Sequence, residues 1–216
     1  MRAFDLRRLK KDAKKSGMRV VGNFLIASYT RDVISGFAID PAPSAIYLWT
    51  FVLPTYDDLP FLHMSLGQRV AVAKGDERFF CGMHTEYVEN LERVRTAADL
   101  LIYVDGLDFR NDYSEWIKYI SAIRLGDFLA ADATLENLLA LPMSSAVQRR
   151  LDAIISVLKN GGESGAQHLL ETWSVQTARL VGGSSWGQRT VANRLAARSP
   201  NAAGNTTLWQ QIVYLQ

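Results

Sequence analysis

The stretch Ala45-Ile46-Tyr47-Leu48-Trp49-Thr50-Phe51-Val52-Leu53 is the clearest strand signal in the chain. Its residues are apolar, aromatic or β-branched, which is typical of a buried β-strand. Because both sets of alternating residues are apolar, we expect this strand in the centre of a sheet, covered on both faces. Two further runs of this kind precede it, at residues 20–26 and 33–39.

Short connections separate these three runs. A turn over residues 29–32 joins the first two, and the proline-containing segment 40–44 joins the second to the third. Parallel neighbours would need a crossover of about a dozen residues or more, so the connections predict an antiparallel meander.

Upstream of the strands, residues 3–15 predict a basic amphipathic helix. Leu6, Leu9 and Ala13 recur at helical spacing, and Gly17 is suited to end the helix. Residues 1–19 hold eight basic side chains and two acidic ones. This clustering suggests a surface for phosphate groups, so nucleic-acid binding is one hypothesis. Its candidate residues are Arg7, Arg8, Lys11 and Lys15.

Downstream of His84 the apolar residues recur every three or four positions, as in amphipathic helices. We expect helices over residues 86–104, 128–139 and 163–180. Asp112 or Ser114 is expected to cap another helix, and Ser144 or Ser145 a further one that ends at residues 160–162. Shorter ones are expected near 188–197 and 208–215. Short connections favour packed antiparallel helical hairpins.

Strands followed by helices predict an α+β fold. The regions are 1–83, containing the sheet, and 84–216, which is helical; one continuous domain is the alternative. Residues 57–83 are open to either assignment: 61–68 read as a short helix or a strand, and 69–73 as an edge strand.

The segment from Arg124 to Leu135 contains a glycine and an aspartate followed by Phe128 and small residues. It resembles the turn between the two helices of a tetratricopeptide-type repeat. The resemblance covers about a dozen residues and occurs once, whereas a solenoid needs about three copies. It therefore implies a helical hairpin and no repeat family.

Composition indicates a soluble protein. The chain has 216 residues, of which 48% are hydrophobic and 21% charged, as in an ordinary globular protein. No apolar run approaches the roughly 18 residues of a membrane span, so we expect no membrane contact. The charged N-terminus lacks the apolar core of a secretory signal, and Cys81 is the single cysteine. These features favour the cytoplasm.

Catalytic motifs are scarce. Cys81 and His84 have a Cys-x-x-His spacing, and His63 could serve as a base, which leaves a hydrolase-type enzyme as an alternative. A zinc site would need more ligands than this spacing supplies, so no metal is expected. No glycine-rich phosphate motif is present, and no cofactor is expected. The acidic pair Asp57-Asp58 is more typical of a turn than of acid–base chemistry.

A pocket between sheet and helices is a further hypothesis. Its candidate lining residues are Tyr56, His63, Arg69 and Arg78, chosen because they fall in predicted loops. Near the end of the sequence, residues 208–215 are rich in large apolar side chains, which predicts docking on the body of the protein or on a partner.

The absence of catalytic motifs, together with basic ends around an acidic middle, favours a non-catalytic role. We expect a protein-interaction factor, of the bacterial accessory, immunity-like or defence-associated kind, whose partner is another protein. The enzyme and nucleic-acid hypotheses remain the alternatives.

Overall fold

The computed structural model describes residues 6–43, 45–73 and 87–182, and for residues 71–73 only the backbone. The strands are β1 (Arg19–Val21), β2 (Phe24–Tyr29), β3 (Val33–Ala42), β4 (Ala45–Pro54) and β5 (Arg69–Ala73). The helices are α1 (Leu6–Lys15), α3 (Ala97–Asp105), α4 (Asp112–Leu125), α5 (Phe128–Leu139) and α6 (Ser145–Leu180), and residues 87–93 are also helical.

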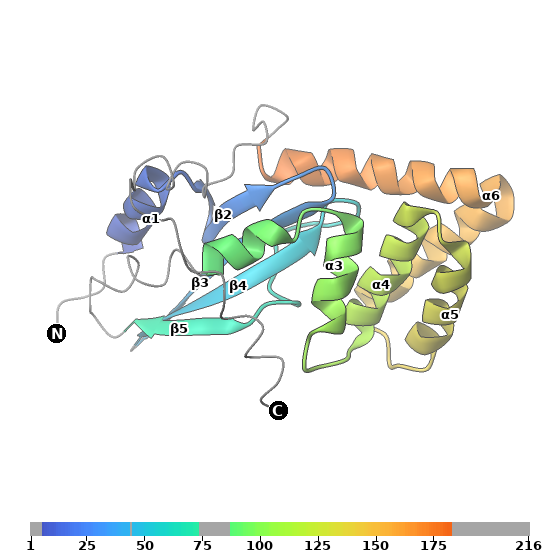
Figure 1. Cartoon of the computed structure of the whole chain (residues 1–216), viewed down its shortest axis with the longest axis horizontal. Helices are drawn as coiled ribbons and strands as arrows, with labels where there is room; N and C mark the ends of the chain where they lie inside the picture. The colour runs from blue at the N-terminus through green and yellow to red at the C-terminus, as the bar shows by residue number, and fades with distance from the viewer. Residues whose placement is uncertain (1–5, 44, 74–86, 183–216) are drawn as a thin grey trace, which may run out of the picture.

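The five strands form one antiparallel sheet in the order β1-β2-β3-β4-β5, so the predicted meander and the α+β class are confirmed (Figure 1). The predicted 20–26 strand is wrong in one respect, because a turn at Gly22 and Asn23 divides it into β1 and β2. The central strand is β3 and not the 45–53 strand, which lies one place from the edge as β4.

The segment between β4 and α3 holds two further corrections. Residues 61–68 form turns and irregular structure, and neither the short helix nor the strand that the sequence left open. The expected helix over 86–104 is interrupted at residues 94–96, where Thr96 accepts a hydrogen bond from the Asp99 backbone N–H and caps α3. The helix breaks here although the apolar spacing continues, because the cap satisfies backbone N–H groups that would otherwise be unpaired at the start of α3.

Two glycines end helices as the sequence predicts. Gly17 has φ of 90° and Gly126 has φ of 77°, a left-handed conformation that costs glycine little. After each, a backbone N–H bonds back to the last turn: Met18 donates to Ala13 at 3.0 Å and Asp127 donates to Ala122 at 2.9 Å. These are Schellman-type ends, which turn the chain sharply into the next element.

The helices beyond the sheet pack in sequence order. α3 lies against α4, and α4 forms a hairpin with α5, while α6 runs past α4 (Figure 1). α5 has the predicted bounds. α6 spans the two helices expected on either side of residues 161–162, and the expected break between them is present at Gly162, whose φ of 61° and ψ of −161° are not helical. The buried core is one cluster that contains residues from both the sheet and the helices.

Several sequence-based expectations lie outside the described residues. They are Arg78, Cys81, His84, the boundary between regions 1–83 and 84–216, and the helices expected near 188–197 and 208–215.

Candidate functional site

A groove lies between the β4–β5 side of the sheet and the helices over residues 87–105, and it encloses about 440 Å³. The helical segment 87–93 crosses the face of the sheet and so forms one wall, while α3 forms the end (Figure 1). The groove takes most of its surface from apolar and aromatic side chains. These are Val70, Tyr87, Leu91, Val94, Ile102 and Tyr103.

Ile102 is the most exposed of these apolar side chains, with 74% of its surface accessible. It lies on α3, a helix whose other face is buried through Ala97, Leu100 and Val104. An isoleucine on the outer face does not help this helix pack, because its surface stays in water. It instead extends the apolar lining of the groove toward the molecular surface.

Some polar groups of the groove are occupied within the protein. The Tyr103 hydroxyl donates to the Leu66 carbonyl oxygen at 2.9 Å, and burial raises the pKa of Tyr103 to about 12. Thr50 Oγ1 accepts from the Gln68 backbone N–H at 3.1 Å. Partial burial opposes ionisation of Asp99, but hydrogen bonds from the backbone N–H groups of Arg95 and Thr96 lower its pKa. These groups hold the walls together.

Three other polar side chains line the groove without such partners. Within the described part of the chain, the side-chain amides of Gln68 and Asn90 and the guanidinium of Arg93 make no hydrogen bond or ion pair with the protein. An amide offers donors and an acceptor, and a guanidinium offers several donors. The groove therefore combines an apolar surface with polar groups that remain available to a ligand.

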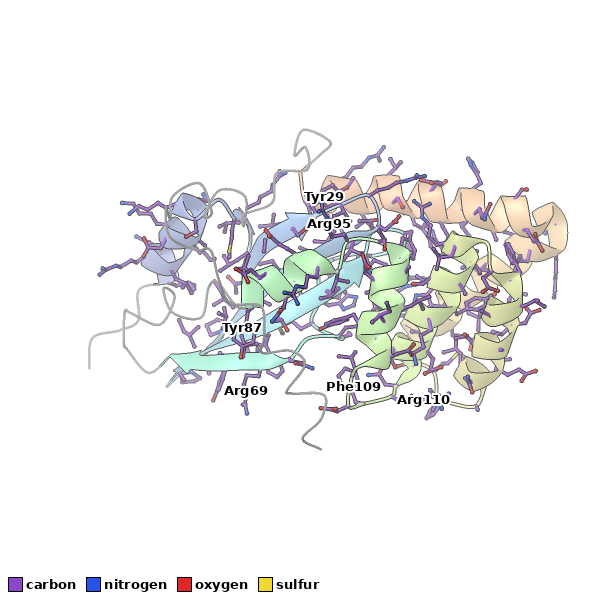
Figure 2. The ribbon with its side chains drawn as sticks, viewed as in Figure 1. Tyr29, Arg69, Tyr87, Arg95, Phe109 and Arg110 are labelled. Carbon is purple, nitrogen blue, oxygen red and sulfur yellow. The ribbon has the colours of Figure 1, made fainter. Side chains whose placement is uncertain are left out.

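The β5 strand borders this groove at the edge of the sheet. Figure 2 shows Arg69 at β5 and Tyr87 above the strand, on the side of the helical segment 87–93. The Arg69 guanidinium lies 5.5 Å from the ring centre of Tyr47 and 6.0 Å from that of Trp49. Because Arg69 pairs with Trp49 across the strands, this cation–aromatic surface is on the sheet face opposite Thr50 and the groove.

A second polar region lies in the interior, around Asp57 just after β4. The Asp57 carboxylate is fully buried and accepts hydrogen bonds from three side chains: Tyr113 Oη at 3.1 Å, Trp116 Nε1 at 3.0 Å and Arg150 Nη1 at 2.9 Å. Thr177 Oγ1 donates to the Asp57 carbonyl oxygen at 3.0 Å. We call this set the Asp57 junction. It connects the end of β4 with α4 and with both halves of α6.

The Asp57 junction has the chemistry of a structural ion pair. Burial raises the pKa of Asp57, while the positive charge of Arg150 and the hydrogen bonds from Trp116 and Tyr113 oppose that rise. All three partners donate, so the arrangement fits the ionised carboxylate. Both charged partners are buried, Arg150 with 5% of its surface exposed. No open position for a substrate atom is left at the carboxylate, because each oxygen is already engaged.

His63 lies beside this junction. Its ring centre is 4.8 Å from that of Tyr113, and its Nδ1 accepts a long hydrogen bond from the Ser65 backbone N–H at 3.4 Å. Burial, and then the positive charge of Arg150, lowers the pKa of His63 to about 4. The imidazole is therefore neutral near pH 7, and it is a weak base.

Arg124 organises a third polar cluster between the β2–β3 turn, α4 and α6. Its guanidinium contacts Asp32 at 3.0 Å and Glu171 at 2.6 Å, and it lies 5.5 Å from the Tyr56 ring centre. Arg31 reaches the same Glu171 oxygen at 2.7 Å. A cavity of about 400 Å³ adjoins these residues, with His168 and Gln167 on its wall. The two arginines and two carboxylates balance one another, so this cluster acts as a clamp between elements.

The loop residues predicted to share a pocket occupy different surroundings. Tyr56 is fully buried, and its hydroxyl shares a hydrogen bond of 2.7 Å with Ser121. His63 packs on Tyr113, and Arg69 covers Tyr47 and Trp49 on the sheet. Neither of the two cavities has Tyr56, His63 or Arg69 in its wall. Of the catalytic candidates, only His63 lies within the described residues.

The basic candidates of the N-terminal helix do share one face. Leu9 and Ala13 of α1 are buried, whereas Arg7, Arg8, Lys11 and Lys15 are exposed. Lys15 lies 3.6 Å from Asp12, and Lys10 donates to Asn23 at 2.9 Å. The outer face of α1 is thus basic, as the sequence predicts.

Sequence reasoning included a pocket between sheet and helices but named none of the residues that line the groove. Asn90, Arg93 and Ile102 fall in a segment expected to form one amphipathic helix, and the break at Thr96, after which α3 begins, was not predicted. The local apolar pattern gave no usable signal, because Leu100 and Val104 are buried while Ile102, in the same apolar stretch, is exposed.

Within residues 6–43, 45–73 and 87–182, no group of three or more His, Cys, Asp and Glu side chains is arranged to hold a metal ion. None of the helices in these ranges combines the length and the apolar character needed to cross a bilayer. Comparison of the chain with protein-family models, curated proteins and solved structures finds no match.

Proposed function

We propose that this protein is a non-catalytic interaction factor that binds a segment of another protein in the groove between β5 and α3. The observation that supports it is the groove itself, which encloses about 440 Å³ and is lined mainly by apolar side chains, including Ile102 with 74% of its surface exposed. Three polar side chains of its wall have no partner among the described residues. Apolar surface beside available polar groups is the usual composition of a binding site.

The energetic argument concerns Ile102. Burying a side chain of this size against a partner contributes about 1.5–3 kcal/mol, and truncating a central anchor in an interface costs a similar amount or more. The exposed apolar side chain contributes little to the isolated protein, so its surface is available to a partner. We place the interaction in the cytoplasm, in a bacterial accessory, immunity-like or defence-associated role, on the strength of the cysteine content and the lack of catalytic motifs.

Affinity capture from the native host, with quantitative mass spectrometry, tests this proposal. The bait proteins are wild type, Ile102→Glu, and Leu129→Glu as a matched control. Leu129 is also a large apolar residue on a helix, 86% exposed, but it lies on α5 away from the groove. We expect a stoichiometric protein partner that wild type and Leu129→Glu retain and Ile102→Glu loses. A partner that Ile102→Glu retains, or no partner, would contradict the proposal.

Nucleic-acid binding is the second candidate, favoured by the exposed basic face of α1. Phosphate contacts release counterions, so such binding would weaken steeply with salt. The bait with Arg7, Arg8, Lys11 and Lys15 replaced by glutamate separates the two functions. If nucleic acid is recovered with wild type and lost with this variant, α1 is the functional surface. If the protein partner is still captured by this variant and after nuclease treatment, the groove is the functional surface.

The enzyme alternative depends on Cys81 and His84, with His63 as a base. A histidine whose pKa is about 4 is mostly unprotonated at neutral pH but accepts a proton reluctantly, which reduces its value as a general base. Capture by a Cys81→Ser bait should equal that of wild type. A loss of capture in that variant with folding intact would instead direct attention to the cysteine.

A further inference from the structure

We propose that the bound segment is an extended peptide that lies beside β5 as an additional strand and carries an acidic group opposite Arg93. This inference rests on the proposed protein-binding function, and it specifies the conformation and the charge of the partner segment.

The position of β5 favours an extended ligand. Among the described strands β5 ends the sheet and pairs on one side only, with β4. A strand with one neighbour presents backbone donors and acceptors on its other side, and an extended peptide can pair with them at about 4.8 Å spacing. The groove lies along this same strand, because Val70 of β5 and Gln68, just before the strand, belong to its wall.

The polar groups of the groove suit a peptide backbone. A carboxamide side chain has the same donor and acceptor pattern as a peptide group, so it can pair with a main-chain N–H and C=O together. Gln68 and Asn90 supply two such amides from opposite walls, the sheet and the helical segment 87–93. A purely apolar ligand would leave both amides unpaired on burial, at a cost of about 1–3 kcal/mol each.

An added strand would present its side chains alternately to the two faces of the sheet. On one face they would enter the groove beside Val70, Leu91 and Ile102. On the other face they would meet the surface formed by Arg69, Tyr47 and Trp49. Both surfaces are partly apolar, so the ligand should have apolar residues at alternate positions in at least the groove-facing set.

The charge of the groove favours an acidic ligand. Arg93 is exposed and makes no ion pair within the described residues, and its guanidinium lines the groove. The acid that lines the groove, Asp99, is engaged by the cap of α3. Glu89 is exposed on the helical segment but is not part of the groove wall, and Glu92 is buried. Arg93 can therefore receive a carboxylate, and a guanidinium binds one with two parallel hydrogen bonds.

A displayed library of random 12-residue peptides, selected on the whole protein, tests this inference. Parallel selections use Arg93→Glu, Ile102→Glu and the Leu129→Glu control. We expect wild type and Leu129→Glu to enrich one motif with apolar residues at every second position and an acidic residue at a fixed place. Arg93→Glu should weaken a synthetic peptide of that motif at least 10-fold and select a basic residue at the same place.

The outcomes separate the two proposals. A motif with apolar residues spaced by three and four would show a helical ligand and overturn the strand inference, while groove binding would stand. If the motif has apolar residues at every second position but its peptide binds Arg93→Glu as tightly as wild type, the inferred contact between Arg93 and an acidic residue is wrong. The proposed function itself would be contradicted if wild type enriches no motif, or only motifs that Ile102→Glu also enriches.

Discussion

The Asp57 junction and the groove beside β5 both place polar groups among apolar ones, but they differ in how those groups are satisfied. At the junction, three side chains from α4 and α6 donate to one buried carboxylate. In the groove, Gln68, Asn90 and Arg93 have no side-chain partner within the described residues. Polar groups that a protein pairs internally hold its elements together, whereas groups left available in a concave apolar surface suit a ligand.

The comparison predicts opposite consequences for mutation. Changes at the junction should reduce stability, and changes in the groove should reduce binding while leaving stability nearly unchanged. Each prediction below tests one part of that contrast.

The largest effect is expected for Arg150→Met, which leaves the buried Asp57 carboxyl without its charged partner. Removing one member of a buried ion pair costs about 3–5 kcal/mol of unfolding free energy. Urea denaturation measures it. The double variant Asp57→Asn/Arg150→Met should cost less than the sum of the two single changes, since the interaction is already lost in either one. A loss of unfolding free energy below about 1 kcal/mol in Arg150→Met would contradict the structural role of the junction.

The next effect is a pH dependence from His63. Its folded pKa is about 4, below the value near 6.5 of an unfolded histidine, so between these pH values the unfolded chain binds the extra proton. Stability should therefore fall by up to about 3 kcal/mol as the pH drops from 6.5 to 4. Denaturation at several pH values measures this slope. His63→Gln lacks the titrating ring, and its curve should be flatter in that window; an unchanged slope would exclude His63 as the cause.

An intermediate effect is expected for Arg124→Met. Arg124 is 10% exposed and joins Asp32 to Glu171, so its loss should cost about 1–3 kcal/mol. Arg31→Met is the matched control, because Arg31 contacts the same Glu171 oxygen but is 76% exposed. Exposed pairs contribute about 0–1 kcal/mol. Equal costs for the two variants in urea denaturation would argue against burial as the deciding factor.

The smallest effect on stability is expected for Arg93→Ala. The side chain is exposed and unpaired within the described residues, and surface changes of this kind usually alter the unfolding free energy by less than about 0.5 kcal/mol. The same denaturation experiment checks it. A loss above about 1 kcal/mol would mean that Arg93 supports the fold, and the contrast with Arg150 would weaken.

The sheet was predictable because strand signals are local. The residue types of 33–39 and 45–53 and the proline-containing connection between them were enough for the antiparallel pairing of β3 with β4. The division of the 20–26 run into β1 and β2 was not predicted, since it depends on a turn at Gly22 and Asn23 within an otherwise continuous apolar run. Likewise the break before α3 depends on the reciprocal hydrogen bonds of Thr96 and Asp99 and not on apolar period.

The sites were less predictable because they join residues distant in sequence. Asp57 and Arg150 are separated by 93 positions, and nothing in the local sequence of either indicates the other. The pair Asp57-Asp58 was expected to form a turn, but Asp57 is fully buried and is the acceptor at the centre of the Asp57 junction. The groove likewise needs Val70 from β5 and Ile102 from α3, which meet only after the chain has folded.

Site-specific photo-crosslinking in the native host tests the central claim most directly. A photoreactive amino acid at position 102 reports contacts of the groove, and the same amino acid at position 129 reports contacts of the outer face of α5. The account predicts a crosslink to one partner protein from position 102 that is absent from position 129 and is reduced by Arg93→Glu. A crosslink from position 129 alone, or equal crosslinks from both positions, would contradict it.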